Sequence, residues 1–150
     1  MRKLMLIFCL VAGANLFGQA ADVNPKAETL LTNFMKALMI QDANTSATEC
    51  LKYVHKSLMN KAGSDLTQDL RNFSFKKAHD NAKFYSIPVK ITRVKKTAVT
   101  AIGFKETGEK GEVHDYFISK IDDKNGLPAP VKIFFPSNGG DPKISYMGSL

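Results

Sequence analysis

Hydrophobic positions recur at helical spacing in the first part of the chain. Apolar residues lie three and four positions apart between Pro25 and Ile40, which predicts an amphipathic helix. Asn24 is expected to cap this helix, and Pro25 suits its first turn because the missing N–H costs nothing there. The predicted core-facing stripe consists of Ala27, Leu30, Leu31, Phe34, Met35, Leu38 and Met39.

Two further helical patterns follow. A second helix is predicted to begin at residue 45 or 46, with Ser46 and Glu49 as a capping box, and to turn Cys50 toward the core. We expect Cys50 to pack as a small apolar side chain rather than to act as a catalytic thiol. A third helix is predicted over Asp65–His79, with core-facing positions at Leu66, Leu70, Phe73 and Ala78.

Downstream, the pattern changes to runs rich in Val, Ile, Thr, Tyr and Phe, which are typical of strands. The predicted strands are Phe84–Lys95, Ala98–Lys105, Val113–Ile121, Val131–Phe135 and Lys143–Met147. The first three are expected to pair in sequence order as an antiparallel meander, with a hairpin turn at residues 106–111. Pro88 donates no backbone hydrogen bond, so the first strand should lie at a sheet edge or carry a bulge there.

This order of elements, helices first and antiparallel strands after, predicts an α+β fold with three N-terminal helices on one face of a four- to five-stranded sheet. The chain has 150 residues, of which 44% are hydrophobic and 23% charged. That length and composition are typical of one compact globular domain, which we place at residues 21–150.

The first twenty residues have the pattern of a secretory signal peptide. Arg2 and Lys3 precede an apolar run, Leu4–Ala12, and small residues at Gly18 and Ala20 suit cleavage after Ala20. The apolar run is too short for a membrane-spanning helix, so no stable membrane insertion is expected after cleavage. The protein is therefore predicted to be exported, to the periplasm or beyond the cell.

Removal of this segment lowers the formal net charge from +7 to +5, because it takes away Arg2 and Lys3, and leaves Cys50 as the one cysteine. No intramolecular disulfide can then form. The remaining lysines are spread along the chain, and no nucleic-acid recognition motif is present, so nucleic acid is not an expected partner. Three isolated histidines do not make a metal site, and no phosphate-binding loop follows a strand, so no metal or cofactor is expected.

Two residues are candidates for acid–base chemistry. Asp115 shares a strand face with Val113 and Phe117, and a carboxyl group on an apolar wall could serve as a general base. The alternative is that His114, Tyr116 and Ile118 form the covered face, which leaves Asp115 in water. His55, near the end of the second helix, could shuttle protons or simply favour the helix C-terminus as a cation.

The chain resembles the nuclear transport factor 2-like (ketosteroid-isomerase-like) superfamily over about residues 25–150. The resemblance lies in the order of the elements, in Phe34–Asp42 followed by a helix ending in the segment Cys50–His55, and in the final segment Lys143–Leu150, which is similar to the last strand of small exported members. It implies a cone-shaped, cystatin-like roll with the first helix across a curled sheet and a cavity between them. Ketosteroid isomerases use a tyrosine on that helix, and this chain has none there.

The sequence leaves three functions open. The leading hypothesis is an exported, non-enzymatic protein that binds a small apolar ligand or an envelope partner, with Phe34, Tyr85 and Phe117 lining the cavity. The second is a lyase or isomerase with Asp115 as base and His55 or Tyr85 as acid. The third is a homodimeric interaction module that pairs through the outer sheet face, using Phe134 and Tyr116.

Overall fold

The computed structural model describes residues 23–96 and 108–150. The predicted signal peptide and the predicted strand Ala98–Lys105 lie outside the described residues. The described chain is α+β, with helices preceding an antiparallel sheet, as the sequence predicts.

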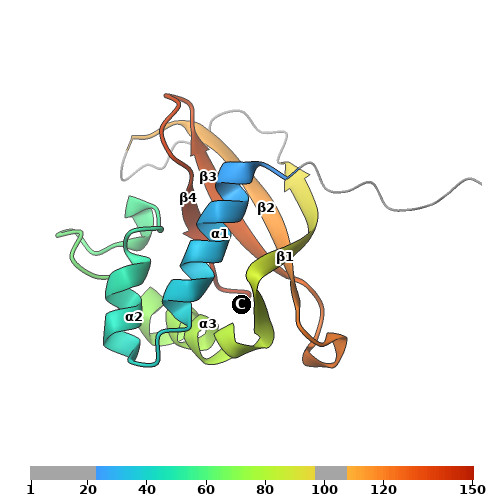
Figure 1. Ribbon diagram of the computed structural model, residues 1–150. Coiled ribbons are helices and arrows are strands. Elements are labelled where there is room, and N and C mark those ends of the chain that lie inside the picture. The colour runs from blue at the N-terminus through green and yellow to red at the C-terminus, as the bar shows by residue number, and fades with distance from the viewer. Residues whose placement is uncertain (1–22, 97–107) are drawn as a thin grey trace, which may run out of the picture.

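The first two helices follow one another at the N-terminal end of the described chain (Figure 1). Helix α1 spans Pro25–Leu38, and the Asn24 side chain accepts a hydrogen bond from the Lys26 N–H, which confirms the predicted cap. Helix α2 spans Ala43–Cys50 and is capped by Asp42, not by Ser46 as predicted. The buried Ser46 hydroxyl instead donates to the Ala37 carbonyl oxygen at 2.8 Å, so it joins the two helices.

The third helical region differs from the prediction. It contains a π-helical segment, Leu70–Phe75, followed by α3, Lys76–Asn81. The wider turn of a π-helix shifts the following side chains around the axis. Phe73, predicted to face the core, is therefore 72% exposed, and Phe75 takes the interior position at 2%.

The four described strands are β1 (Tyr85–Lys96), β2 (Gly111–Lys120), β3 (Ala129–Pro136) and β4 (Lys143–Tyr146). They pair antiparallel in the order β1-β2-β3-β4 (Figure 1). Because β1 pairs directly with β2, the first and third predicted runs are neighbours in the described sheet, so the predicted order of neighbours in the meander is wrong. Short 3₁₀ turns occur at Lys56–Leu58, Ala82–Phe84 and Asp123–Asn125.

Strand β1 lies at the edge of the described sheet and also carries an irregularity at Pro88, so both predicted consequences of this proline are present. The pairing register shifts between Tyr85 and Lys90. A shift of this kind interrupts the alternation of faces. Tyr85 and Val89 are consequently buried, whereas Ile87, two positions from each of them, is 39% exposed.

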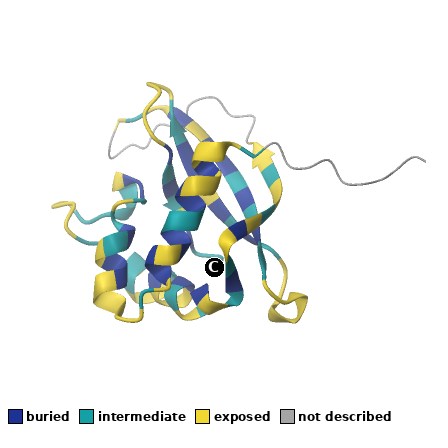
Figure 2. Cartoon of the chain, viewed as in Figure 1, coloured by how far each residue is buried: buried dark blue, intermediate teal, exposed yellow. Residues whose placement is uncertain are grey.

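Helix α1 lies across one face of the sheet, and Figure 2 shows its buried positions turned toward the strands. We call this the inner face of the sheet. Its core contains Phe34 from α1 together with Tyr116, Ile118, Ile133 and Ile144 from the strands, all at 1% exposure or less. The side chains of α1 and of the inner face thus pack against each other in the main core.

Candidate functional site

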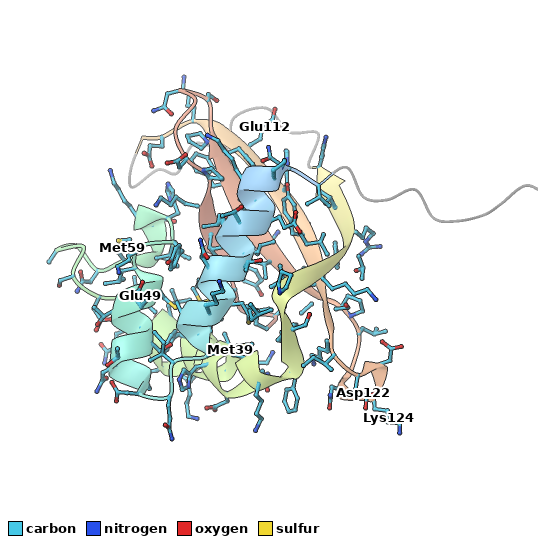
Figure 3. The ribbon with its side chains drawn as sticks, in the orientation of Figure 1. Met39, Glu49, Met59, Glu112, Asp122 and Lys124 are labelled. Atoms are coloured by element: carbon cyan, nitrogen blue, oxygen red, sulfur yellow. The ribbon has the colours of Figure 1, made fainter. Side chains whose placement is uncertain are left out.

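A cleft with a volume of about 1140 Å³ lies between the segment after α2 and the ends of β3 and β4. Leu51, Met59, Phe134 and Pro136 give it apolar walls. Figure 3 labels Met59, which lines the cleft from the segment after α2. The polar lining includes His55, Ser57, Glu109 and Asn138, with lysines at Lys56, Lys61 and Lys143.

His55 is held in this cleft by backbone pairing with the last strand. Val54 forms a parallel bridge with Ile144: the His55 N–H donates to the Ile144 carbonyl oxygen at 2.7 Å, and the Ile144 N–H donates to the Tyr53 carbonyl oxygen at 2.9 Å. Because side chains alternate along an extended segment, Val54 enters the main core and His55 points the other way. Its ring packs edge-on against Phe134, with 4.8 Å between ring centroids, and is 3% exposed.

Both ring nitrogens of His55 have hydrogen-bonding partners. Nδ1 lies 2.9 Å from the Ser57 Oγ and accepts from the Ser57 backbone N–H at 3.2 Å. Nε2 lies 2.7 Å from Oε2 of Glu109, whose side chain is 35% exposed. Since Nδ1 accepts the backbone N–H, the neutral ring carries its proton on Nε2 and donates it to the carboxylate. Ser57, His55 and Glu109 therefore form a continuous hydrogen-bonded chain.

Some of the charged groups around the cleft form an ion pair or a hydrogen bond, and others are exposed lysines. Asp141 forms an ion pair with Lys26 at 3.3 Å, and the Lys143 ammonium donates to the Lys52 carbonyl oxygen at 2.8 Å. Lys56 and Lys61 are exposed and line the same cleft. Their positive charge favours an anionic group at the cleft mouth.

Asp115, the predicted base, lies elsewhere. It shares a strand face with Val113 and Phe117 as predicted, but the helix-covered inner face is formed by His114, Tyr116 and Ile118. The alternative prediction is confirmed for the covered face, because α1 covers the face of opposite parity, but it is wrong for Asp115, whose side chain is 17% exposed and is not left in water. The Asp115 Oδ1 lies 3.5 Å from the Lys132 Nζ in an ion pair, and Asp115 does not line the His55 cleft. The two predicted catalytic residues, Asp115 and His55, therefore do not lie in the same site.

The predicted ligand-lining residues are also separated. Phe34 and Tyr85 belong to the main core, whereas Phe117 lies on the opposite sheet face beneath Arg93, whose guanidinium carbon is 3.8 Å from the ring centroid. Burial raises the pKa of the Tyr85 phenol, and its hydroxyl has no hydrogen-bond partner in the described part of the chain. None of the three lines the His55 cleft.

The other two histidines each make a hydrogen bond with a neighbouring group, and Cys50 is buried in the core. The His79 Nε2 lies 2.8 Å from the Ile40 carbonyl oxygen, and the His114 Nε2 lies 2.9 Å from the Glu112 carboxylate. Cys50 is fully buried, which raises the pKa of its thiol to about 12 and confirms its predicted place in the core. Across residues 23–96 and 108–150, no group of three metal-ligating side chains could hold an ion.

Sequence reasoning identified His55 but neither of its partners. Ser57 carries a local signal, since it lies two positions after a histidine that precedes a short turn. Glu109 was assigned only to a turn, and it lies 54 positions from His55 in the chain. Their contact depends on how β2 and β4 place the two segments, which the local pattern does not encode.

In comparisons with known proteins, no family model, no curated protein and no solved structure matches this chain. Among the described helices, none has both the length and the apolar character needed to cross a membrane.

Proposed function

We propose that this is an exported binding protein whose His55 cleft holds a small molecule with an apolar body and an anionic group. The observation that carries the proposal is the composition of the cleft, in which apolar walls are combined with exposed lysines at Lys56 and Lys61. Small-molecule sites are concave, mostly apolar and supplied with a few polar groups that fix orientation. The cleft volume of about 1140 Å³ is ample for such a ligand.

Two further parts of the proposal rest on sequence. Export is supported by Arg2 and Lys3 ahead of the apolar run Leu4–Ala12. Membership of the nuclear transport factor 2-like superfamily is supported by the order of helices and antiparallel strands, and it includes the finer expectation of a cone-shaped roll. One fold can support many functions, so membership of this superfamily is compatible with a binding site beside the sheet.

Titration calorimetry with decanoate, a carboxylate on an apolar chain, tests the binding proposal. We expect saturable binding that weakens as the salt concentration rises, because the lysine contribution is electrostatic. Lys61→Ala should weaken binding by about fivefold, as expected for the loss of one exposed charge contact. Met59→Ala should weaken it through the loss of apolar contact.

Lys90→Ala is the matched control, because it removes the same charge from an exposed position on β1 outside the cleft. It should bind decanoate as the unmodified protein does. Absence of decanoate binding, or equal losses in the Lys61 and Lys90 variants, would contradict the proposed site.

A further inference from the structure

We propose that Ser57 is a nucleophile activated by His55, and that the cleft hydrolyses carboxylic esters with an apolar acyl group. This inference rests on the proposed function, since the same apolar walls must admit the acyl chain. Ser57 and His55 would be the catalytic residues, and Glu109 a positioning residue. The three side chains are linked by contacts of 2.9 Å and 2.7 Å at one edge of the cleft.

A local turn alone does not account for this arrangement. The Ser57 N–H bonded to the His55 Nδ1 is a common way to begin a short helical turn. It does not require an imidazole that is 3% exposed, nor a carboxylate brought 2.7 Å from its other nitrogen by a distant part of the chain. A serine, a histidine and an acid linked in that order are the groups used in nucleophilic acyl transfer.

The hydrogen-bond directions also suit a base. Glu109 accepts the Nε2 proton, so Nδ1 keeps a lone pair, which the Ser57 hydroxyl at 2.9 Å shares with the Ser57 backbone N–H at 3.2 Å. The two ring nitrogens exchange the roles that they have in the Ser-His-Asp triad of serine proteases, in which Nε2 faces the serine. Either nitrogen of an imidazole can accept a proton when the other carries one, and the hydrogen bond that the other nitrogen makes decides which of them is the acceptor.

The reaction balances with water as the second reactant. The Ser57 Oγ attacks the ester carbonyl carbon while its proton moves to the His55 Nδ1, which gives a tetrahedral intermediate with a negative oxygen. The C–O bond to the alcohol then breaks, and the alcohol leaves with that proton. Water attacks the acyl-Ser57 ester, gives a proton to Nδ1 and releases the carboxylic acid as the serine recovers its proton. The lysines of the cleft favour the anionic intermediate.

A fluorophosphonate probe tests the nucleophile directly, because it forms a covalent bond with activated serines. We expect one adduct per chain in intact-mass measurements, located on Ser57 by peptide sequencing. Ser57→Ala and His55→Gln should abolish labelling, whereas Ser64→Ala, a serine substitution in the same segment, should retain it. The location of the adduct in the unmodified protein decides the matter even if a variant fails to fold.

Hydrolysis of p-nitrophenyl butyrate tests the role of Glu109. Glu109→Gln should lower kcat by about a hundredfold or more with little change in KM, since an orienting acid acts on the chemical step. Glu109→Asp should recover part of the rate. An equal loss in both variants accompanied by a lower melting temperature would overturn the positioning role.

The outcomes separate this inference from the proposed function. Decanoate binding without labelling of Ser57 would overturn acyl transfer and leave the binding site in place. A protein that neither binds decanoate nor labels would overturn both. Labelling at a residue other than Ser57 would also overturn the inference.

Discussion

The main core on the inner face and the His55 cleft bury side chains by different means. On the inner face, Phe34 and Ile133 are fully buried through apolar packing against neighbouring side chains. On the cleft side, His55 is 3% exposed, yet both of its ring nitrogens are hydrogen-bonded. A buried apolar group is stabilised by leaving water, whereas a buried polar group must replace the hydrogen bonds that water gave it. Substitutions on the inner face should therefore change stability, and those on the cleft side should change function.

The same contrast separates two potential nucleophiles. Cys50 is fully buried in the main core, and burial raises the pKa of its thiol to about 12, so thiolate is scarce at neutral pH. Ser57 lies at the cleft, partly exposed and beside an imidazole nitrogen. Intrinsic reactivity favours a cysteine, but access and a neighbouring base favour Ser57.

The largest effect is expected from removing a side chain of the inner face. Phe34→Ala should lower the free energy of unfolding by about 3–5 kcal/mol, because it leaves a cavity among closely packed residues. Phe73→Ala is the matched control: that ring is 72% exposed, so its loss should change stability by less than about 0.5 kcal/mol. Urea denaturation measures both, and similar losses would contradict the burial difference.

A smaller effect is expected where the cleft side meets the sheet. In Gly111→Ala, the new methyl group would collide with the Phe135 carbonyl oxygen and lie 2.5 Å from Cε2 of Phe134, the ring that packs on His55. We expect a loss of about 1–3 kcal/mol, typical of overpacking, together with weaker decanoate binding.

The neighbouring residue supplies the control for this substitution. Lys110 is exposed, and its backbone hydrogen bonds do not depend on the side chain, so Lys110→Ala should keep both stability and binding. Unchanged stability in Gly111→Ala, measured by the same urea titration, would mean that Phe134 can move without cost.

The smallest effect is expected at the surface, away from both faces. Hydrogen bonds from Thr45 hold the pKa of Asp42 below its ordinary value of 3.8. A depressed carboxyl pKa contributes stability that is present above that value and is lost as the pH falls through the folded-state pKa. Asp42→Ala should therefore lower the melting temperature by a few degrees near neutral pH and by less in acid.

Melting curves from neutral pH down to about pH 2, well below the ordinary carboxyl pKa, measure this difference. The exposed Asp123 supplies the comparison, and Asp123→Ala should have a weaker pH dependence. A loss in Asp42→Ala that stays constant down to the lowest pH would show that the cap does not act through its charge.

The sequence predicted local structure better than the contacts between distant segments. The helix at Pro25, the strands β3 and β4 and the edge position of β1 follow from periodicity and from Pro88, because these signals act within a few residues. The exposure of Phe73 could not be predicted, since a π-helical segment changes the period that the prediction assumes. The pairing of β1 with β2 was missed because neighbouring strands in sequence were assumed to be neighbours in the sheet.

The candidate site was predicted only in part for the same reason. His55 was predicted near the end of the second helix, but α2 ends at Cys50 and His55 lies in an extended segment. Its proposed role as a base depends on Glu109, which a turn far along the chain supplies. Asp115 was a plausible base only if its strand face was the covered one, and a two-residue period gives no indication of which face a helix will cover.

The pairing of Val54 with Ile144 has a consequence for how the protein is made. Ribosomes synthesise the chain from its N-terminus, so His55 emerges well before β4, whose backbone fixes its position. Closing so long a loop is entropically costly and tends to come late in folding. The geometry of the proposed site should consequently be acquired late in folding, and a nascent or truncated chain without β4 should show neither the proposed binding nor the proposed hydrolysis.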